Sequence, residues 1–331
     1  MPIKTVAILY PGAMGASLAR TLHVRQPQLT LLTSLSARST STLERASTSG
    51  LQNVPLSKLV ERSDVIISIL PPSAAVALVL EVLDVLSHRS SQKPPIYVDA
   101  NAISPGTVSE ISALLAPHQI PFIDGGVLGL PATETFDPKI YLSSAKAWEG
   151  QMREVVSAIG GGREGNGLNI EVLEDGGEGA ASALKMCYGG INKGYTGLAS
   201  LIVLAAHAHS PGTANALLRE FSLSKTAALE TFSNSFPDMV GKAYRFVGEM
   251  REVSSFIHTA LSSLPYTTPD DAKKVADTYE GLAEVFQRIA NDMRSESASG
   301  EDAKSEGEVA TLLDFAEKGK KAVIKVRESK Q

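Results

Sequence analysis

The sequence predicts an α/β domain followed by an all-helical domain, with one long helix joining the two. In the first half of the chain, short apolar runs typical of strands alternate with segments of helical periodicity. That alternation is the pattern of βαβ units in a mainly parallel, doubly wound sheet. From about residue 177 onward, strand patterns give way to long helical ones. We therefore expect an α/β domain over residues 1–176 and a helical domain over residues 177–331.

The strands of the first half are predicted where β-branched and aromatic residues gather. They cover residues 4–10, 30–33, 64–70, 95–100, 121–124 and 140–143. Apolar residues at helical spacing predict helices over 16–23 and 74–87. The strand over 64–70 must end where it does, because a central strand does not tolerate the following Pro71 and Pro72.

The second half is predicted to be helical, beginning with one helix of some 30 residues over 177–209. Further helices are expected over 213–219, 225–233, 238–259, 270–292 and 308–326. The polar stretch 295–306 predicts a loop.

Composition excludes several classes of function. The net charge is −5, with 31 basic and 36 acidic residues and no basic run, so a nucleic-acid partner is not expected. A single cysteine, Cys187, excludes a disulfide framework, and the six histidines form no HExxH pair that would indicate a metal. The longest apolar run has about half the ~20 residues that span a bilayer. We expect a cytoplasmic protein with no metal and no membrane partner.

The turn after the first strand predicts a site for the pyrophosphate of a dinucleotide. A helix that opens on glycines presents free N–H groups and its positive dipole end to an anion. The turn here comprises Tyr10, Pro11, Gly12, Ala13, Met14 and Gly15. Tyr10 replaces the first glycine of the usual GxGxxG pattern, so an ordinary βα turn is the alternative interpretation.

The residues after the second strand favour NADP, with NAD still possible. Sites for NAD place an Asp or Glu about 20 residues beyond the glycines, where it binds the ribose hydroxyls. No acidic residue lies between Leu29 and Leu43, and that stretch offers hydroxyls such as Ser34 and one guanidinium, Arg38. Arg38 suits a 2′-phosphate. A solvated polar loop would have the same composition.

Lys185 lies in the long helix among small and apolar neighbours, which is unusual for an exposed lysine. Burial would lower the pKa of its amine, so that it could exchange protons near neutral pH. Tyr188, Gly189 and Asn192 share its helix face. The alternative is a lysine that extends from an apolar helix into water, which is what we expect of the nearby Lys193.

Several segments, in this order, resemble the β-hydroxyacid dehydrogenases, relatives of 6-phosphogluconate dehydrogenase. The matching segments are the GxGxMG-like turn at residues 10–15, Leu70-Pro71, residues 99–105 (DANAISP), residues 124–130 (DGGVLGL) and Lys185. Beyond Pro211, the sequence YRFVGEM at residues 244–250 is similar to a subfamily with a phosphogluconate-dehydrogenase-type C-terminal domain.

The resemblance implies a Rossmann domain, a helical domain that binds substrate and forms a homodimer, and hydride transfer between NADP and a small hydroxy acid or its keto counterpart. Lys185 would be the general acid or base. The implied cofactor contacts are Pro11, Gly12, Ala13, Met14, Gly15, Ser34, Arg38, Leu70, Pro71, Pro72 and Asn101. The implied substrate contacts are Asn101, Gly126, Val127, Leu128, Gly129, Tyr188 and Asn192.

The chain also departs from the family pattern. Tyr188 and Gly189 stand where the family has asparagines, and Asn101 stands in place of a substrate-binding serine. Leu128 and Leu130 make the acyl-binding loop more apolar than a small polar substrate needs. Two alternatives therefore stay open: an imine or ketone reductase on the same scaffold, and a non-catalytic NADP-binding or sensor protein.

Overall fold

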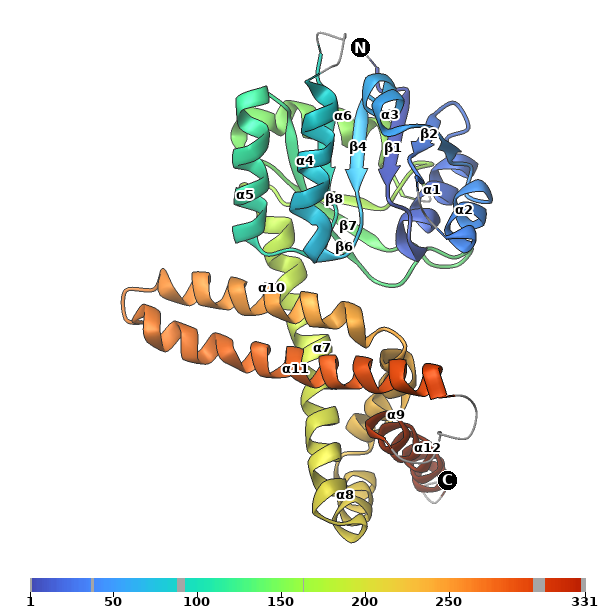
Figure 1. Ribbon diagram of the computed structural model, residues 1–331, viewed down its shortest axis with the longest axis vertical. Coiled ribbons are helices and arrows are strands. Elements are labelled where there is room, and N and C mark those ends of the chain that lie inside the picture. The colour runs from blue at the N-terminus through green and yellow to red at the C-terminus, as the bar shows by residue number, and fades with distance from the viewer. Residues whose placement is uncertain (1, 37–38, 88–92, 163, 300–306, 329–331) are drawn as a thin grey trace. The chain divides into compact units, whose positions relative to one another are not determined.

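The computed structural model describes residues 2–36, 39–87, 93–162, 164–299 and 307–328 (Figure 1). The chain forms two compact units, Met1–Tyr188 and Gly189–Gln331. Helix α7 (Ala180–His209) runs through the division between them. The predicted domain boundary at residue 176 lies just before this helix.

The first unit is built on one sheet, which contains eight strands within the described residues, in the order β3-β2-β1-β4-β5-β6-β7-β8. All neighbouring strands are parallel except β6 and β7. The strands are β1 (Thr5–Leu9), β2 (Thr30–Thr33), β3 (Gln52–Asn53), β4 (Val65–Ser68), β5 (Ile96–Asp99), β6 (Phe122–Leu128), β7 (Lys139–Ser143) and β8 (Ile170–Val172). The predicted fold class, a mainly parallel doubly wound sheet followed by helices, is confirmed.

Helices cover both faces of this sheet. They are α1 (Ala13–Arg25), α2 (Thr40–Ser47), α3 (Leu56–Arg62), α4 (Ala75–Leu86), α5 (Pro105–Leu115) and α6 (Glu149–Ile159), with short 3₁₀ turns at Pro72–Ala74, Ala116–His118 and Lys146–Trp148. One apolar core lies under α1, α2 and α6, and the other lies under α3, α4 and α5. The sequence did not predict α2, α3, α5, α6, β3 or β8.

The second unit is helical throughout its described residues. After α7 come α8 (Pro211–Ser224), α9 (Thr226–Val240), α10 (Ala243–Ser262), α11 (Pro269–Ser299) and α12 (Glu308–Glu328). The start of α8 is capped by Ser210, whose Oγ accepts from Thr213 N at 3.0 Å, and Pro211 occupies the first helical position.

Two predicted boundaries in this unit are wrong. We expected a break between residues 233 and 238, but α9 continues through Pro237 to Val240. The helix persists because Phe236 and Met239, on either side of the proline, are buried. Residues 295–299, predicted as loop, belong to α11, and the rest of that stretch, residues 300–306, lies outside the described residues.

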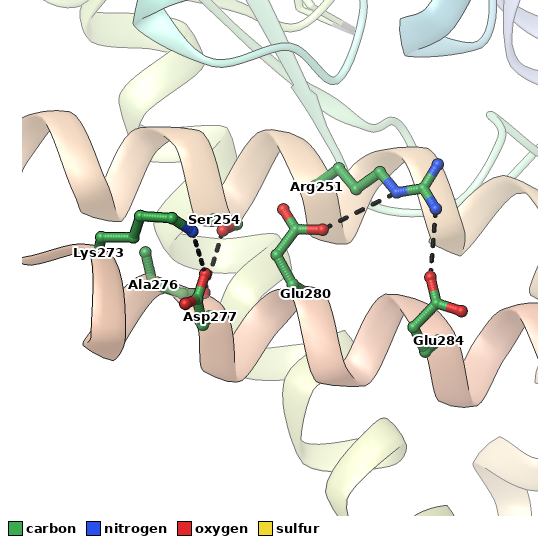
Figure 2. A network of polar contacts seen from close by, with 7 residues as sticks. All are labelled: Arg251, Ser254, Lys273, Ala276, Asp277, Glu280 and Glu284. Carbon is green, nitrogen blue, oxygen red and sulfur yellow. Dashed lines mark hydrogen bonds and ion pairs between the residues drawn. The ribbon is translucent and has the colours of Figure 1, made fainter.

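Helices α10 and α11 form an antiparallel hairpin, and polar contacts join its middle turns (Figure 2). Ser254 Oγ donates to the carbonyl oxygen of Ala276 at 3.0 Å, and Arg251 reaches Glu280 and Glu284 at 3.9 and 3.3 Å. None of the helices that the structure describes is long and apolar enough to cross a membrane.

Candidate functional site

The register of the sheet brings the predicted site segments to one edge. Leu9 and Ser68, the last residues of β1 and β4, are partners, and Ser68 is in turn the partner of Asp99 at the end of β5. Asp99 pairs with Asp124 of β6, which continues for four more residues to Leu128. The loops that follow Leu9, Ser68 and Asp99 therefore leave the sheet side by side, next to the last four residues of β6. In doubly wound folds, ligands bind at this carboxyl edge.

The turn between β1 and α1 fits the pyrophosphate of a dinucleotide. Gly12 is the N-cap of α1, makes no side-chain capping bond and is exposed, and the first turn carries no acidic residue. Apart from those of its two chain neighbours, no described atom lies within 4 Å of the position that a Cβ on Gly12 would occupy. The first N–H groups of a helix have no partner within that helix, so an anion can approach them here. Pro11 and Ala13 flank Gly12, and Met14 packs against the core.

Gly15 and Tyr10 explain how this turn packs. A Cβ on Gly15 would come within 2.7 Å of Ile69 Cγ2 and 3.3 Å of Ile8 Cγ2, so glycine allows α1 to lie close to the sheet. Tyr10 replaces a glycine, and its hydroxyl donates to Glu81 Oε2 at 3.1 Å. Its side chain is thereby directed toward α4.

The segment after β2, predicted only as a polar stretch, leads into helix α2. Ser34 is buried, and the hydroxyl of Ser39 lies 3.1 Å from that of Ser41 and 3.0 Å from that of Thr42 at the start of α2. Arg38, the predicted clamp for a 2′-phosphate, lies outside the described residues. Among the described residues between β2 and the first turn of α2, the structure thus places hydroxyl groups and no acidic side chain.

Asn101 is buried and bonded to its neighbours through both ends of its amide. Its Nδ2 donates to Ser68 Oγ at 2.8 Å and to Asp99 Oδ2 at 2.7 Å, and its Oδ1 accepts from Leu70 N at 2.7 Å. Both amide protons are used within the protein. Asn101 therefore fixes the turn that carries Leu70, Pro71 and Pro72 beside the dinucleotide turn, and only Oδ1 has a lone pair left.

Asp124 joins β6 to the start of α7. Its Oδ1 accepts from Ser182 Oγ at 2.5 Å, and its Oδ2 accepts from Ser182 N at 3.0 Å and from Ser143 Oγ at 2.9 Å. Ser143 Oγ also accepts from Ala181 N at 3.0 Å. Burial raises the pKa of the Asp124 carboxyl, and the hydrogen bonds from Ser182 and Ser143 oppose that shift. Because Ser182 lies in the first turn of α7, the negative charge of the Asp124 carboxylate also interacts favourably with the positive end of that helix's dipole.

Two glycines allow the close contacts around β6. A Cβ on Gly126 would lie 2.6 Å from the carbonyl oxygen of Ala181 and 3.5 Å from Lys185 Cβ. A Cβ on Gly125 would lie 2.8 Å from the carbonyl oxygen of Asp99. Gly126, predicted as a source of backbone donors for substrate, thus lies directly against α7.

Lys185 lies one turn beyond Ser182, and its Nζ donates to the carbonyl oxygen of Val127. Among the described strands, the ladder between β5 and β6 ends at Asp124, so Val127 and Leu128 pair only with β7. Burial lowers the pKa of Lys185 to about 8. The amine is therefore held beside the part of β6 that has no pairing with β5. Its lowered pKa allows it to gain or lose a proton near neutral pH.

The remaining predicted residues are placed as follows. Gly129 follows β6 with a φ of +112°, Tyr188 is half exposed at the end of the first unit, and Asn192 is exposed in the second. Lys193 is not solvated as expected, because its Nζ forms an ion pair with Glu249 and lies 4.7 Å from the ring centre of Phe246.

The sequence predicted no role for Asp124, Ser143 or Ser182. The signal for Asp124 is a carboxylate within an apolar strand directly before two glycines. No pattern in the sequence connects it with Ser182, which is 58 residues away. Within the described part of the chain, no group of three or more His, Cys, Asp or Glu side chains could hold a metal ion.

Comparison with known proteins identifies two domain families. Residues 5–166 match the NAD binding domain of 6-phosphogluconate dehydrogenase, and residues 208–289 match a domain of unknown function, DUF1932. No curated protein matches the chain in sequence.

Solved structures share the fold. One is a conserved protein of unknown function described as structurally similar to 3-hydroxyacid dehydrogenases, with 25% identity, a TM-score of 0.52, and coverage of 86% of this chain and 99% of that one. Another is a conserved hypothetical protein from Sinorhizobium meliloti 1021, with 20% identity, a TM-score of 0.56, and coverage of 95% and 97%. The chain thus carries a 6-phosphogluconate dehydrogenase-type NAD binding domain followed by a DUF1932 domain, and it is similar in structure to a protein described as like the 3-hydroxyacid dehydrogenases.

Proposed function

We propose that this protein is an NADP-dependent oxidoreductase acting on a small hydroxy acid or its keto counterpart, with Lys185 as the general acid or base. The observation that carries the proposal is the position of Lys185. Its buried amine, with a pKa lowered to about 8, is held on Val127. Val127 lies three residues beyond Asp124 on β6, and Asp124 is in register with the strand ends that lead to Gly12 and Leu70.

Bound nicotinamide would accept a hydride from the alcohol carbon, or supply one to the carbonyl carbon in reverse. The protein's part is to move the proton. In oxidation, the neutral amine of Lys185 takes the hydroxyl proton and becomes an ammonium as the C–O bond gains double-bond character. In reduction, the ammonium returns that proton to the carbonyl oxygen. Asp124 and Ser182 hold the first turn of α7, and so keep the amine where the proton is exchanged.

The preference for NADP rests on the segment after β2. No acidic residue lies there to bind a free 2′-hydroxyl, and Ser39 and Ser41 place hydroxyl groups at the N-terminus of α2. A 2′-phosphate would find donors in these hydroxyls and in the helix N–H groups. Arg38, directly before Ser39, would add a charge-assisted bond.

A bulkier substrate, such as a cyclic imine or a ketone, is the second candidate. Leu128 is half-buried at the end of β6, and Leu130, two residues on, is 68% exposed. Apolar side chains on the segment that continues from Val127 suit a larger apolar group than a short hydroxy acid carries.

We also propose a cytoplasmic homodimer. In the second unit, α7 exposes Ile191, Tyr195, Leu198 and Ile202, which are 74%, 43%, 53% and 48% exposed. Their spacing of four, three and four residues forms one apolar stripe, the pattern by which helices associate. A second copy of the same helix would cover it. Cys187 is exposed and free, which suits a reducing compartment.

The experiment that tests the reaction separates cofactor binding from turnover. Calorimetry measures the Kd for NADPH, and a screen of hydroxy acids with NADP⁺, and of ketones and cyclic imines with NADPH, measures turnover. We expect Lys185→Met to bind NADPH within about threefold of wild type and to lose at least ~100-fold in kcat, the usual contribution of general acid–base catalysis. Turnover that survives in this variant would refute the role of Lys185. NADPH binding without turnover of any substrate by wild type would favour a sensor protein.

A further inference from the structure

The loop between β6 and β7, residues 129–138, lies against the helix that opens at the dinucleotide turn. Ala132 N, near the tip of the loop, donates to Ser17 Oγ at 3.1 Å. Ser17 is in the second turn of α1 and is 5% exposed. The segment that continues from Val127 and Leu128 is thus bonded to the helix that would hold the pyrophosphate.

The far end of this loop has a separate anchor. Arg25, at the end of α1, binds both carboxylate oxygens of Asp137 at 2.9 and 3.0 Å. Arg25 Nη1 also donates to the carbonyl oxygen of Gly167 at 2.8 Å. This bidentate pair holds the base of the loop whether or not its tip is in place.

The tip of the loop has little burial to hold it. Thr133 N donates to the Phe136 carbonyl oxygen at 2.8 Å, which closes a tight turn, but Leu130 and Phe136 remain 68% and 43% exposed. Because few apolar side chains of the tip are removed from water, a single hydrogen bond carries a large share of its stability. The hydrogen bond from Ala132 N to Ser17 Oγ is such a bond, because it joins the tip of the loop to α1.

Ser17 is bonded to the dinucleotide turn as well. Its Oγ donates to the carbonyl oxygen of Met14 at 2.8 Å, within the first turn of α1. A hydroxyl has one proton and can accept two bonds. Since the proton of Ser17 is directed to Met14, its oxygen is left facing the Ala132 N–H. The geometry of the first turn therefore decides whether Ser17 can accept from the loop.

We infer that Ser17 is a positioning residue that couples binding of the dinucleotide pyrophosphate at the first turn of α1 to the position of the β6–β7 loop. An anion on the N–H groups of this turn stiffens the turn and keeps the Met14 carbonyl directed at Ser17, which then holds Ala132. The order of the loop beside Val127 and Lys185 follows from cofactor binding. This inference rests on the proposed function, because it requires NADPH to bind at α1.

Hydrogen exchange of the loop, with and without NADPH, tests the coupling. In wild type we expect NADPH to slow exchange over residues 130–137 by about tenfold, and in Ser17→Ala by less than about threefold, the difference being the worth of about one hydrogen bond. The matched control is Thr21→Val, which removes a hydroxyl bond made only to the Ser17 carbonyl oxygen within α1. It should behave as wild type.

The outcomes separate this inference from the proposed function. A Ser17→Ala protein that binds NADPH and shows the full wild-type protection would overturn the coupling and leave the reaction standing. Failure of wild type to bind NADPH in calorimetry would overturn both. If Ser17→Ala does not fold, Ala132→Pro removes the donor of the same bond from the loop side, and the same loss of NADPH-dependent protection over residues 133–137 is expected.

Discussion

The carboxylate of Asp124 accepts hydrogen bonds from both the backbone N–H and the hydroxyl of Ser182, three residues before Lys185 on α7. All the atoms of this contact are fully buried. A strand in the middle of the sheet is thereby fixed to the first turn of a long helix. The position of the Lys185 amine depends on that junction as much as on the helix itself.

Asp124→Asn should therefore destabilise the protein. The amide keeps one acceptor oxygen but turns an NH₂ group toward donors, and the charge at the α7 N-terminus is lost. We expect the free energy of unfolding to fall by about 2–4 kcal/mol, as when one partner of a buried charged network is replaced. Denaturant titration measures this loss. Ser143→Ala, which removes one of the three donors to Asp124, should lower the free energy of unfolding by less. An equal loss in the two variants would contradict the view that the carboxylate is the main contact at this junction.

The pH dependence of catalysis should reveal Lys185. Its pKa is lowered to about 8, so the amine is mostly charged below that pH. In the oxidative direction, which needs the neutral base, kcat/KM should rise about tenfold per pH unit below pH 8 and level off above it. In the reductive direction, which needs the ammonium, kcat/KM should fall above pH 8. Profiles with the same sign in both directions would rule out Lys185 as the exchanging group.

The same group should contribute to stability at alkaline pH. Between pH 8 and 10.5 the unfolded chain holds the Lys185 proton and the folded chain does not, because the folded pKa is lowered from 10.5. The unfolded state then binds more protons, so this contribution to the free energy of unfolding rises with pH, by at most ~1.4 kcal/mol per unit. Subtracting the free energy of unfolding of Lys185→Met from that of wild type at each pH isolates the contribution of Lys185. A difference that falls with pH would contradict the lowered pKa.

Gly126 and Gly12 should respond oppositely to a methyl group. A Cβ on Gly126 would overlap the Ala181 carbonyl oxygen at 2.6 Å, and backbone atoms cannot yield cheaply. Gly126→Ala should cost about 1–3 kcal/mol of stability, as overpacking does. Gly12→Ala meets no described atom within 4 Å and should leave thermal unfolding unchanged while weakening NADPH binding. Equal Tm values for the two variants would show that α7 does not lie as close to β6 as described.

Much of this arrangement follows from the sequence, and the exceptions have physical causes. The long strands and helices were predicted because their apolar residues repeat at the right period. Helix α2 was missed because it opens on Thr40, Ser41 and Thr42, whose hydroxyls favour turns, and only Ala46 of this helix is buried. Strand β8 was missed because it is a three-residue edge strand that follows a glycine-rich stretch.

The candidate site was predicted in its local parts and not in its connections. The turn at Gly12 and the amine of Lys185 are each visible from neighbouring residues. The bonds from Asn101 to Leu70, and from Asp124 to Ser182, join segments 31 and 58 residues apart. Only the register of the sheet decides such contacts, and no local pattern encodes it.

The stripe on α7 predicts the oligomeric state. Replacing Ile191 and Leu198 by Glu would place two carboxylates in the proposed helix–helix contact, at positions that now hold apolar side chains. Burying such charges without partners costs several kcal/mol, so sedimentation equilibrium should show a dimer for wild type and a monomer for the double variant. Glutamate at Val275, which is 53% exposed on α11 and outside the stripe, is the control and should leave the dimer intact. A monomeric wild type would remove the homodimer from the proposal.

The residues after β2 predict which dinucleotide is preferred. Arg38→Ala removes the cation proposed to bind the 2′-phosphate, so the Kd for NADPH should rise about tenfold while the Kd for NADH changes little, as expected for one charge-assisted bond. Ser34→Asp should act in the opposite sense. A carboxylate there would accept from a free 2′-hydroxyl and repel a phosphate, so NADH should bind more tightly and NADPH more weakly. Titrating NADPH and NADH against both variants gives the ratio of the two Kd values, which a general loss of structure does not change. If that ratio moves in neither variant, the segment after β2 does not contact the 2′ position, and the preference for NADP loses its support.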